Sequence, residues 1–183
     1  MDKNFVSRSK SSNQFVDIGA VGYETNLAGV THIARLENAN RRVTKEAERL
    51  ILAGTPSTFD SSRNMGVVIL RTSWYAGKPT SQYYVDAQKL QSCVSPPIEL
   101  ACCLREALSD DDMRQLGFDW LAVLHSSVSS DQIDRILTLD SYTLGSWLRL
   151  CDYSWHRTWA LNGGLVFAYP IYRMPTRWRF GVW

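Results

Sequence analysis

Residues 30–53 read VTHIARLENANRRVTKEAERLILA, and this stretch decides the expected fold. Its apolar residues recur in steps of three and four, which is the spacing of one face of an amphipathic helix. Gly54 and Pro56 follow, and both residue types end helices. We therefore predict one long helix whose apolar stripe either faces the core or meets a partner helix. The stripe consists of Ile33, Leu36, Val43, Ala47 and Leu50, with Asn40 in its gap.

The outer face of this helix is expected to be basic. Two pairs of opposite charge four residues apart, Glu37–Arg41 and Arg42–Glu46, would stabilise it. Upstream, residues 1–14 are polar, rich in serine and basic, so we expect a flexible arm there. Residues 15–183 are then expected to form a single domain. The cations of the outer face are Arg35, Arg41, Arg42, Lys45 and Arg49.

Strand and turn patterns follow the helix. Residues 67–75 (VVILRTSWY) are β-branched and aromatic, which predicts a strand. A Gly-Lys-Pro-Thr turn and a return strand at 82–85 complete a predicted β-hairpin. Two prolines then open a helix over about 97–108. Ser109, which three aspartates follow, is predicted to cap a further short helix.

Residues 130–149 (SDQIDRILTLDSYTLGSWLR) resemble a helix-turn-helix. The second of the two helices offers one cation, Arg149, and residues 99–152 carry four basic against ten acidic residues, which opposes docking on phosphate. Two interpretations stay open: a DNA-reading unit, or a plain helical hairpin that packs or binds a protein partner. The apolar positions of the motif hold Ile133, Leu137, Leu139, Leu144 and Trp147.

The last 31 residues predict a three-stranded antiparallel meander around an Asn162-Gly163-Gly164 turn. They hold nine of the 21 aromatic residues, four arginines and no carboxylate. Aromatic rings stack on bases and arginines neutralise phosphates, so this composition suits single-stranded nucleic acid. The alternative is an ordinary core sheet in which Arg157 lies over a Trp ring.

Composition excludes several classes of protein. The chain has 183 residues, of which 45% are hydrophobic and 21% charged, as in globular domains rather than disordered, collagenous or coiled-coil chains. No apolar run reaches the roughly 18 residues that cross a bilayer, so no membrane partner is expected. No secretory signal is recognisable, so we expect a cytoplasmic protein with reduced thiols. The cysteines are Cys93, Cys102, Cys103 and Cys151.

Catalytic and metal-binding motifs are weak. The cysteine spacings match no zinc-finger class, so neither a metal nor a cofactor is expected. Residues 76–81 fail as a phosphate loop because a proline stands where the motif needs Ser or Thr. No catalytic residue is predicted. A hydrolase built on Cys102 or Cys103 with a histidine is the least favoured alternative. The histidines are His32, His125 and His156.

Together these patterns predict an α+β fold with a long N-terminal helix, a β-hairpin, a helical middle with a helix-turn-helix-like hairpin, and a C-terminal antiparallel meander. The net charge of +2 is distributed as +4 over residues 1–92, −6 over 99–152 and +4 over 153–183.

We therefore expect a non-enzymatic protein that binds DNA or RNA as a subunit of a larger assembly, a coat protein or a regulator of DNA processes among them. Its acidic middle would contact protein partners or further copies of the chain. The alternative is a protein-binding module or inhibitor that uses the acidic helical hairpin at 109–151. The predicted nucleic-acid-binding residues are Arg41, Arg42, Lys45, Arg49, Arg173, Arg177, Trp178 and Arg179.

Overall fold

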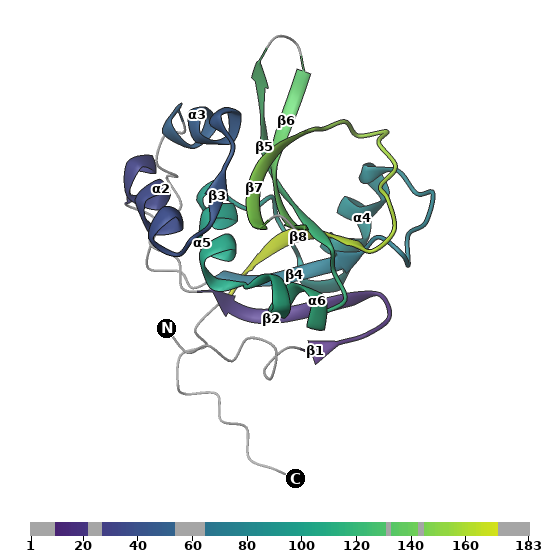
Figure 1. Ribbon diagram of the computed structural model, residues 1–183. Coiled ribbons are helices and arrows are strands. Elements are labelled where there is room, and N and C mark those ends of the chain that lie inside the picture. Colours follow the sequence, from purple (N-terminus) through teal and green to yellow (C-terminus); the bar gives the residue numbers. More distant parts are fainter. Residues whose placement is uncertain (1–9, 22–26, 54–64, 131–132, 143–144, 172–183) are drawn as a thin grey trace, which may run out of the picture.

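One mixed eight-stranded sheet organises the chain (Figure 1). The computed structural model describes residues 10–21, 27–53, 65–130, 133–142 and 145–171. Neighbouring strands follow the order β1-β2-β4-β8-β5-β6-β7-β3. All pairs are antiparallel except β5–β8 and β3–β7, which are parallel. The strands are β1 (Lys10–Ser11), β2 (Phe15–Val21), β3 (Arg42–Val43), β4 (Met65–Arg71), β5 (Trp120–Ser130), β6 (Ile133–Tyr142), β7 (Gly145–Asp152) and β8 (Gly163–Pro170).

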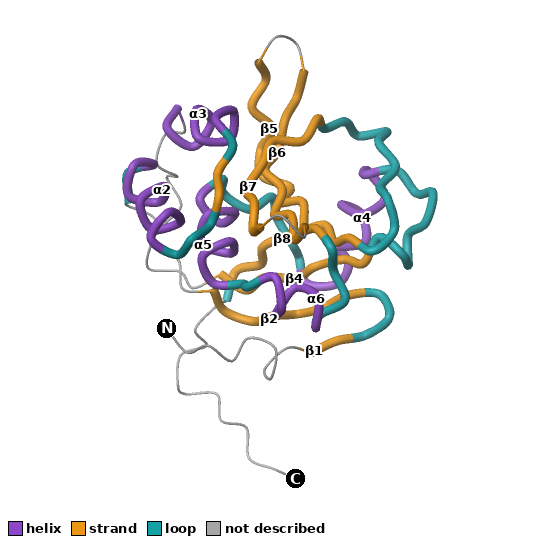
Figure 2. Tube along the Cα trace, viewed as in Figure 1, coloured by secondary structure: helices purple, strands orange, loops and turns teal. Residues whose placement is uncertain are grey.

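Helices cover both faces of the sheet. On one face lie α2 (Gly29–Asn38), α3 (Lys45–Ala53), α5 (Glu99–Ala107) and α6 (Asp110–Gln115), and on the other lies α4 (Thr80–Gln91) (Figure 1, Figure 2). Seven of the nine residues of α5 are buried, so this helix forms the centre of the first layer. The segment between β7 and β8 shares the second face with α4.

The two central strands explain why the sheet forms. The first six residues of β4 and of β8 are all buried, as expected for strands covered on both faces. Val67 and Ile69 enter the core beneath α5, whereas Val68 and Leu70 enter the core beneath α4. Alternate residues of one strand therefore serve two separate cores.

The prediction of a long N-terminal helix is wrong. The segment divides into α2, β3 and α3, and the break falls at Asn40, whose φ is +55°. Asn tolerates the left-handed conformation better than most residues, so it ends α2 where the apolar stripe has its gap. The stripe residues nevertheless face the core: Ile33, Leu36, Ala47 and Leu50 are buried, and Val43 is half-buried against them. The pattern therefore predicted the buried side chains correctly but not the element.

The predicted β-hairpin is also wrong. Its first strand is confirmed as β4, but residues 82–85 lie within α4. Gly77, with φ +74°, lies in the expected turn, and the chain then enters a helix directly after Pro79. Tyr83 and Ala87 are buried four residues apart, which is a helical spacing that the short window at 82–85 hid.

The expected helical hairpin over residues 109–151 is corrected to one short helix followed by three strands. Residues 130–149, which resemble a helix-turn-helix, form the end of β5, then β6 and most of β7. Leu148 packs in the core beneath α5, whereas Trp147 and Arg149 lie on the opposite face, as in a strand. Cross-strand burial overrides the helix-like spacing of apolar residues here.

The C-terminal meander is corrected in part. The return strand is confirmed as β8, but it pairs with β4 and β5 and not with residues 155–161, which form turns and one isolated bridge. Asn162, with φ +65°, stands in the expected turn. The third predicted strand, 177–183, lies outside the described residues.

The α5–α6 junction matches the prediction. The Ser109 hydroxyl accepts a hydrogen bond from the backbone N–H of Asp112, and the Asp112 carboxylate accepts one from the N–H of Ser109. This reciprocal capping fixes the start of α6. None of the helices in the described residues has the length and apolar character needed to span a bilayer.

Candidate nucleic-acid interface

Strand pairing places a row of side chains across one face of the sheet. Arg42 pairs with Trp147, and Trp147 with Asp140. Asp140 in turn pairs with Trp120, and Trp120 with Gly163. Because directly paired residues point to the same face of a sheet, these side chains lie side by side. We call this set, with Arg149, Trp159 and Arg157, the cross-sheet row.

Two arginines lie against one tryptophan at the β3–β7 end of the row. The guanidinium carbons of Arg42 and Arg149 are 5.3 Å and 5.0 Å from the centre of the Trp147 ring. Both contacts are within the range of cation–π attraction. Arg42 is exposed, and the Arg149 side chain is 40% exposed. The ring therefore holds two cations close together while both remain in contact with solvent.

One carboxylate lies within the row. Asp140 is buried, and its Oδ2 is 3.5 Å from Nε of Arg149. Burial raises the pKa of Asp140, which Arg149 and Arg105 oppose by charge attraction. Arg42 has no ion pair with a carboxylate among the described residues. The Arg42–Trp147–Arg149 cluster therefore keeps a net positive charge.

Aromatic residues continue the row beyond Asp140. The Trp120 and Trp159 rings are 5.5 Å apart, and the Arg157 guanidinium carbon is 4.6 Å from the centre of the Trp159 ring. The contact of Arg157 with a Trp ring, which belongs to the alternative of an ordinary core sheet, is therefore confirmed. The indole N–H of Trp159 donates to the hydroxyl of Thr80 at 2.9 Å. Gly163 leaves room for Trp120, because a Cβ at this position would lie 2.0 Å from the ring.

A pocket of about 670 Å³ opens beside the cationic end of the row. Two of its nitrogen donors, Nε of Arg41 and Nε1 of Trp147, make no hydrogen bond within the described part of the chain. One carboxylate, Glu37, contributes to the wall, so the pocket is mixed in charge with an excess of cations. The lining residues are Glu37, Asn40, Arg41, Arg42, Val43, Gly145 and Trp147.

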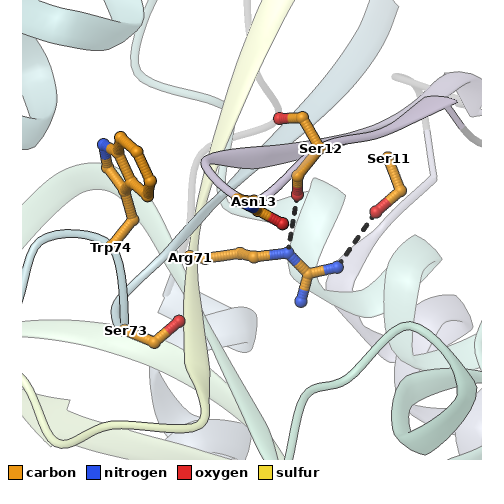
Figure 3. Close-up of a pocket in the computed structure, with 6 residues that line it drawn as sticks. All are labelled: Ser11, Ser12, Asn13, Arg71, Ser73 and Trp74. Atoms are coloured by element: carbon orange, nitrogen blue, oxygen red, sulfur yellow. Dashed lines mark hydrogen bonds between the residues drawn. The ribbon is translucent and has the colours of Figure 1, made fainter.

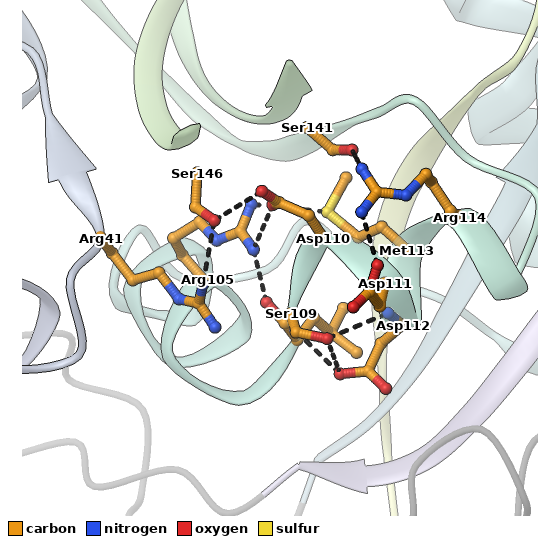
Figure 4. A network of polar contacts seen from close by, with 11 residues as sticks. Arg41, Arg105, Ser109, Asp110, Asp111, Asp112, Met113, Arg114, Ser141 and Ser146 are labelled. Atoms are coloured by element: carbon orange, nitrogen blue, oxygen red, sulfur yellow. Dashed lines mark hydrogen bonds and ion pairs between the residues drawn. The ribbon is translucent and has the colours of Figure 1, made fainter. Parts of the chain in front are cut away.

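A polar network on the helix side of the pocket holds Arg41 in place (Figure 4). Nη1 of Arg41 donates to the Ser146 hydroxyl at 2.9 Å, and that hydroxyl donates to Oδ2 of Asp110 at 2.7 Å. Oδ1 of Asp110 pairs with Nη2 of Arg105 at 3.0 Å. Arg105 is fully buried, and burial lowers the pKa of its guanidinium while Asp110 favours the charged form. Arg41, which directly precedes β3, and Ser146 on β7 thus join the helix layer to the pocket.

The structure brings only part of the predicted binding set together. Arg41 and Arg42 both line the pocket. Lys45 and Arg49 are exposed on α3 but do not line it. The remaining predicted residues, Arg173, Arg177, Trp178 and Arg179, lie outside the described residues. Sequence reasoning did not place Trp147 and Arg149 beside Arg42, because it assigned them to a helix.

The surroundings of Cys93, Cys102 and the buried His125 oppose nucleophilic chemistry at these three residues. Burial raises the pKa of Cys93 to about 11 and raises the pKa of Cys102 further above its ordinary value. Both thiols therefore stay protonated near neutral pH. Both ring nitrogens of His125 bond to backbone: Leu137 N–H donates to Nε2 at 3.0 Å, and Nδ1 lies 2.8 Å from the Ser126 carbonyl oxygen. No cluster of metal-ligating side chains occurs among the described residues.

Comparison of the chain with protein-family models, curated proteins and solved structures gave no match. The assignment of a function therefore rests on the geometry and charge of the cross-sheet row.

Proposed function

We propose that this chain is a non-enzymatic nucleic-acid-binding protein that holds a single-stranded segment at the exposed Arg42–Trp147–Arg149 end of the cross-sheet row, as a subunit of a larger assembly. The observation that carries the proposal is the Arg42–Trp147–Arg149 cluster, in which one ring orients two guanidinium groups beside an open pocket. Guanidinium groups contact phosphate, and neighbouring aromatic rings offer stacking surfaces for bases.

A single strand fits this surface better than a duplex. The row lies across paired strands, and none of the helices in the described part of the chain projects from it to enter a major groove. A single strand can instead lie over the exposed cationic end of the row, where Arg42 and Arg149 reach solvent. The exposed cations Lys45 and Arg49 lie on the neighbouring α3, where Glu46 and Glu48 balance their charge.

The choice between nucleic-acid binding and protein inhibition rests on the charge distribution of the chain. Several acidic groups of the middle segment pair within the chain, as Asp110 with Arg105, Asp111 with Arg114 and Asp152 with Arg135. They leave less free negative charge for a basic partner than the sequence suggests. For this reason we favour nucleic-acid binding over the protein-inhibitor alternative.

The test is fluorescence anisotropy with a labelled mixed-sequence single strand across a salt series. We expect a negative log–log slope, and Arg42→Gln should reduce its magnitude by roughly 0.7 because one phosphate contact is lost. Lys89→Gln is the matched control, since it removes the same charge from a side chain that is 72% exposed on α4. A salt-independent signal, or equal losses in both variants, would overturn the proposal.

A further inference from the structure

A second pocket opens between the β1–β2 turn and the end of β4 (Figure 3). Its volume is about 540 Å³, which is within the range of pockets that take small organic ligands. One of its described lining residues carries a positive charge, and none of them carries a carboxylate. The lining residues are Ser11, Ser12, Asn13, Arg71, Ser73 and Trp74.

This pocket is separate from the Arg42–Trp147–Arg149 cluster. Arg71 shares with Ile69 the face of β4 that is directed to the core beneath α5, and its guanidinium carbon lies 4.8 Å from the centre of the Phe118 ring in that core. The cross-sheet row lies on the opposite face, where Trp120 packs against the core beneath α4. A ligand of the second pocket is therefore a second ligand.

The Arg71 guanidinium is held in place without being neutralised. Its Nε donates to the Ser12 carbonyl oxygen at 3.1 Å, and its Nη2 donates to the Ser11 hydroxyl at 3.1 Å. It makes no ion pair with a carboxylate among the described residues. Partial burial lowers the pKa of Arg71, but an arginine stays charged at neutral pH. The pocket therefore offers a preorganised cation to an anion.

The β1–β2 turn fixes its own shape and presents further donors. The Ser12 hydroxyl accepts hydrogen bonds from the backbone N–H groups two and three residues later, at 3.2 Å and 3.1 Å. The Ser11 hydroxyl accepts the bond from Arg71, so its own hydrogen remains for another acceptor. Asn13 and Ser73 bring an exposed amide and an exposed hydroxyl to the same pocket. Donors on two segments suit the three oxygens of a tetrahedral phosphate better than a planar carboxylate.

An exposed indole forms another part of the wall. Trp74 is 58% exposed, and an indole offers a large flat surface on which any base can stack. Figure 3 shows its ring and the Arg71 guanidinium apart, on different sides of Asn13. One ligand that uses both groups must therefore carry its phosphate and its ring system at two ends, as a nucleoside monophosphate does.

We propose that this pocket binds a free nucleoside monophosphate, with the phosphate on Arg71 and the Ser11 hydroxyl and the base against Trp74. The guanidinium supplies charge-assisted hydrogen bonds to the phosphate, and the indole supplies the stacking surface. The site does not depend on the proposed function, because it lies on the other face of the sheet and takes a mononucleotide rather than a strand.

The test is a titration of the isotope-labelled chain with adenosine monophosphate, followed by two-dimensional amide NMR spectra. We expect shifts of the Trp74 indole N–H and of the backbone N–H groups of Ser11, Ser12 and Asn13. Adenosine, which lacks the phosphate, and inorganic phosphate, which lacks the base, are the comparison ligands. Each should bind roughly tenfold more weakly, because each forgoes one of the two contacts.

Two variants separate the two contacts. Arg71→Gln should reduce the affinity for adenosine monophosphate to that for adenosine, and Trp74→Ser should reduce it to that for inorganic phosphate. Arg71 also holds the β1–β2 turn, so unchanged peaks elsewhere in the spectrum must confirm the fold, and the exposed Trp74 provides the second variant. Trp155→Ser is the control, because Trp155 is a 51% exposed indole outside the described lining of the pocket, and it should bind like the parent protein.

Three results would overturn the inference. They are an absence of shifts, equal affinities for adenosine and adenosine monophosphate, and shifts confined to the Trp147 indole and its neighbours. The last result would mean that the phosphate uses the interface of the proposed function instead. The salt series with Arg42→Gln tests single-strand binding separately, so the failure of one proposal leaves the other standing.

Discussion

Among the described residues, arginines from two regions of the molecule can be compared by their environment. In the helix layer, Arg105 is fully buried and pairs with the Asp110 carboxylate. At the end of the sheet, Arg42, Arg71 and Arg157 lie against aromatic rings instead. A carboxylate neutralises the cation that it holds, whereas a ring orients the cation and leaves its charge in place.

The charge of Arg105 therefore contributes to folding, whereas the charge of Arg42 remains available to a ligand. Desolvation is costly for Arg105, so the loss of either partner leaves an uncompensated buried charge. Arg42 keeps its contact with water and has little to lose on folding. We therefore expect substitutions in the first region to change stability and those in the second to change binding.

The largest effect should come from Arg105→Met. It removes the partner of Asp110 and should lower the free energy of unfolding by about 3–5 kcal/mol, measured by urea denaturation. The double variant R105M/D110N should regain part of this loss because no unpaired carboxylate remains. Arg42→Met is the matched control and should stay within about 0.5 kcal/mol of the parent protein. Equal losses for R105M and R42M would remove the distinction between the two regions.

Gly163→Ala should disturb the packing of the Trp120 ring against the sheet. A Cβ there would lie 2.0 Å from the Trp120 ring, so the indole must move away from its place over Gly163. We expect a loss of about 1–3 kcal/mol in the free energy of unfolding, as for other overpacked sites. Trp120→Leu in the same chain should relieve the clash, so that the two substitutions together cost less than their sum. Strict additivity would show that Trp120 does not pack on Gly163.

His125 extends the comparison to a buried group that is kept neutral. Burial lowers the pKa of His125 below its ordinary value of 6.5 because it disfavours the charged ring. Protonation of Nε2 would in addition break the hydrogen bond that it accepts from Leu137 N–H. The unfolded chain therefore binds a proton first as the pH falls. The stability that neutral His125 contributes is complete above pH 6.5 and is lost as the pH falls toward the folded pKa, by up to about 1.4 kcal/mol per pH unit.

The measurement is chemical denaturation between pH 7.5 and pH 5.5. The parent protein and the His156→Gln variant should show the same decline in the free energy of unfolding, since His156 is exposed. His125→Gln should be less stable at pH 7.5 but should show a shallower decline. Parallel pH profiles for the parent protein and His125→Gln would mean that His125 is not the titrating group.

Sequence patterns correctly predicted those elements whose formation depends on residues close together in the chain. Ser109 with Asp112 gave the start of α6, and the β-branched run at 67–75 gave β4. The stripe at 33–50 identified core side chains but not the interruption at Asn40, because the two helices and β3 keep these residues on the same side. The left-handed conformation of Asn40 ends α2, and the hydrophobic period contains no signal for this interruption.

The candidate site was predictable only in part for a different reason. Arg41 and Arg42 were recognisable as a basic pair, but their partner Trp147 is more than one hundred residues away along the chain. Only the register of β3 on β7 brings Arg42 to Trp147, and register depends on pairing across the whole sheet. Alternation over residues 146–150 was the available signal for β7, and the helix-turn-helix resemblance concealed it.

The smallest effect should come from Arg114→Gln, which separates the contribution of an ion pair to stability from the contribution of burial. Arg114 pairs with the Asp111 carboxylate at 2.5 Å, closer than Arg105 does with Asp110, yet its side chain is 53% exposed and that of Asp111 is 79% exposed. Water screens such a pair, so we expect a loss of at most about 0.5 kcal/mol by urea denaturation and no change in nucleic-acid affinity. A loss comparable to that of Arg105→Met would show that pairing with a carboxylate, rather than burial, sets the contribution of an arginine to stability.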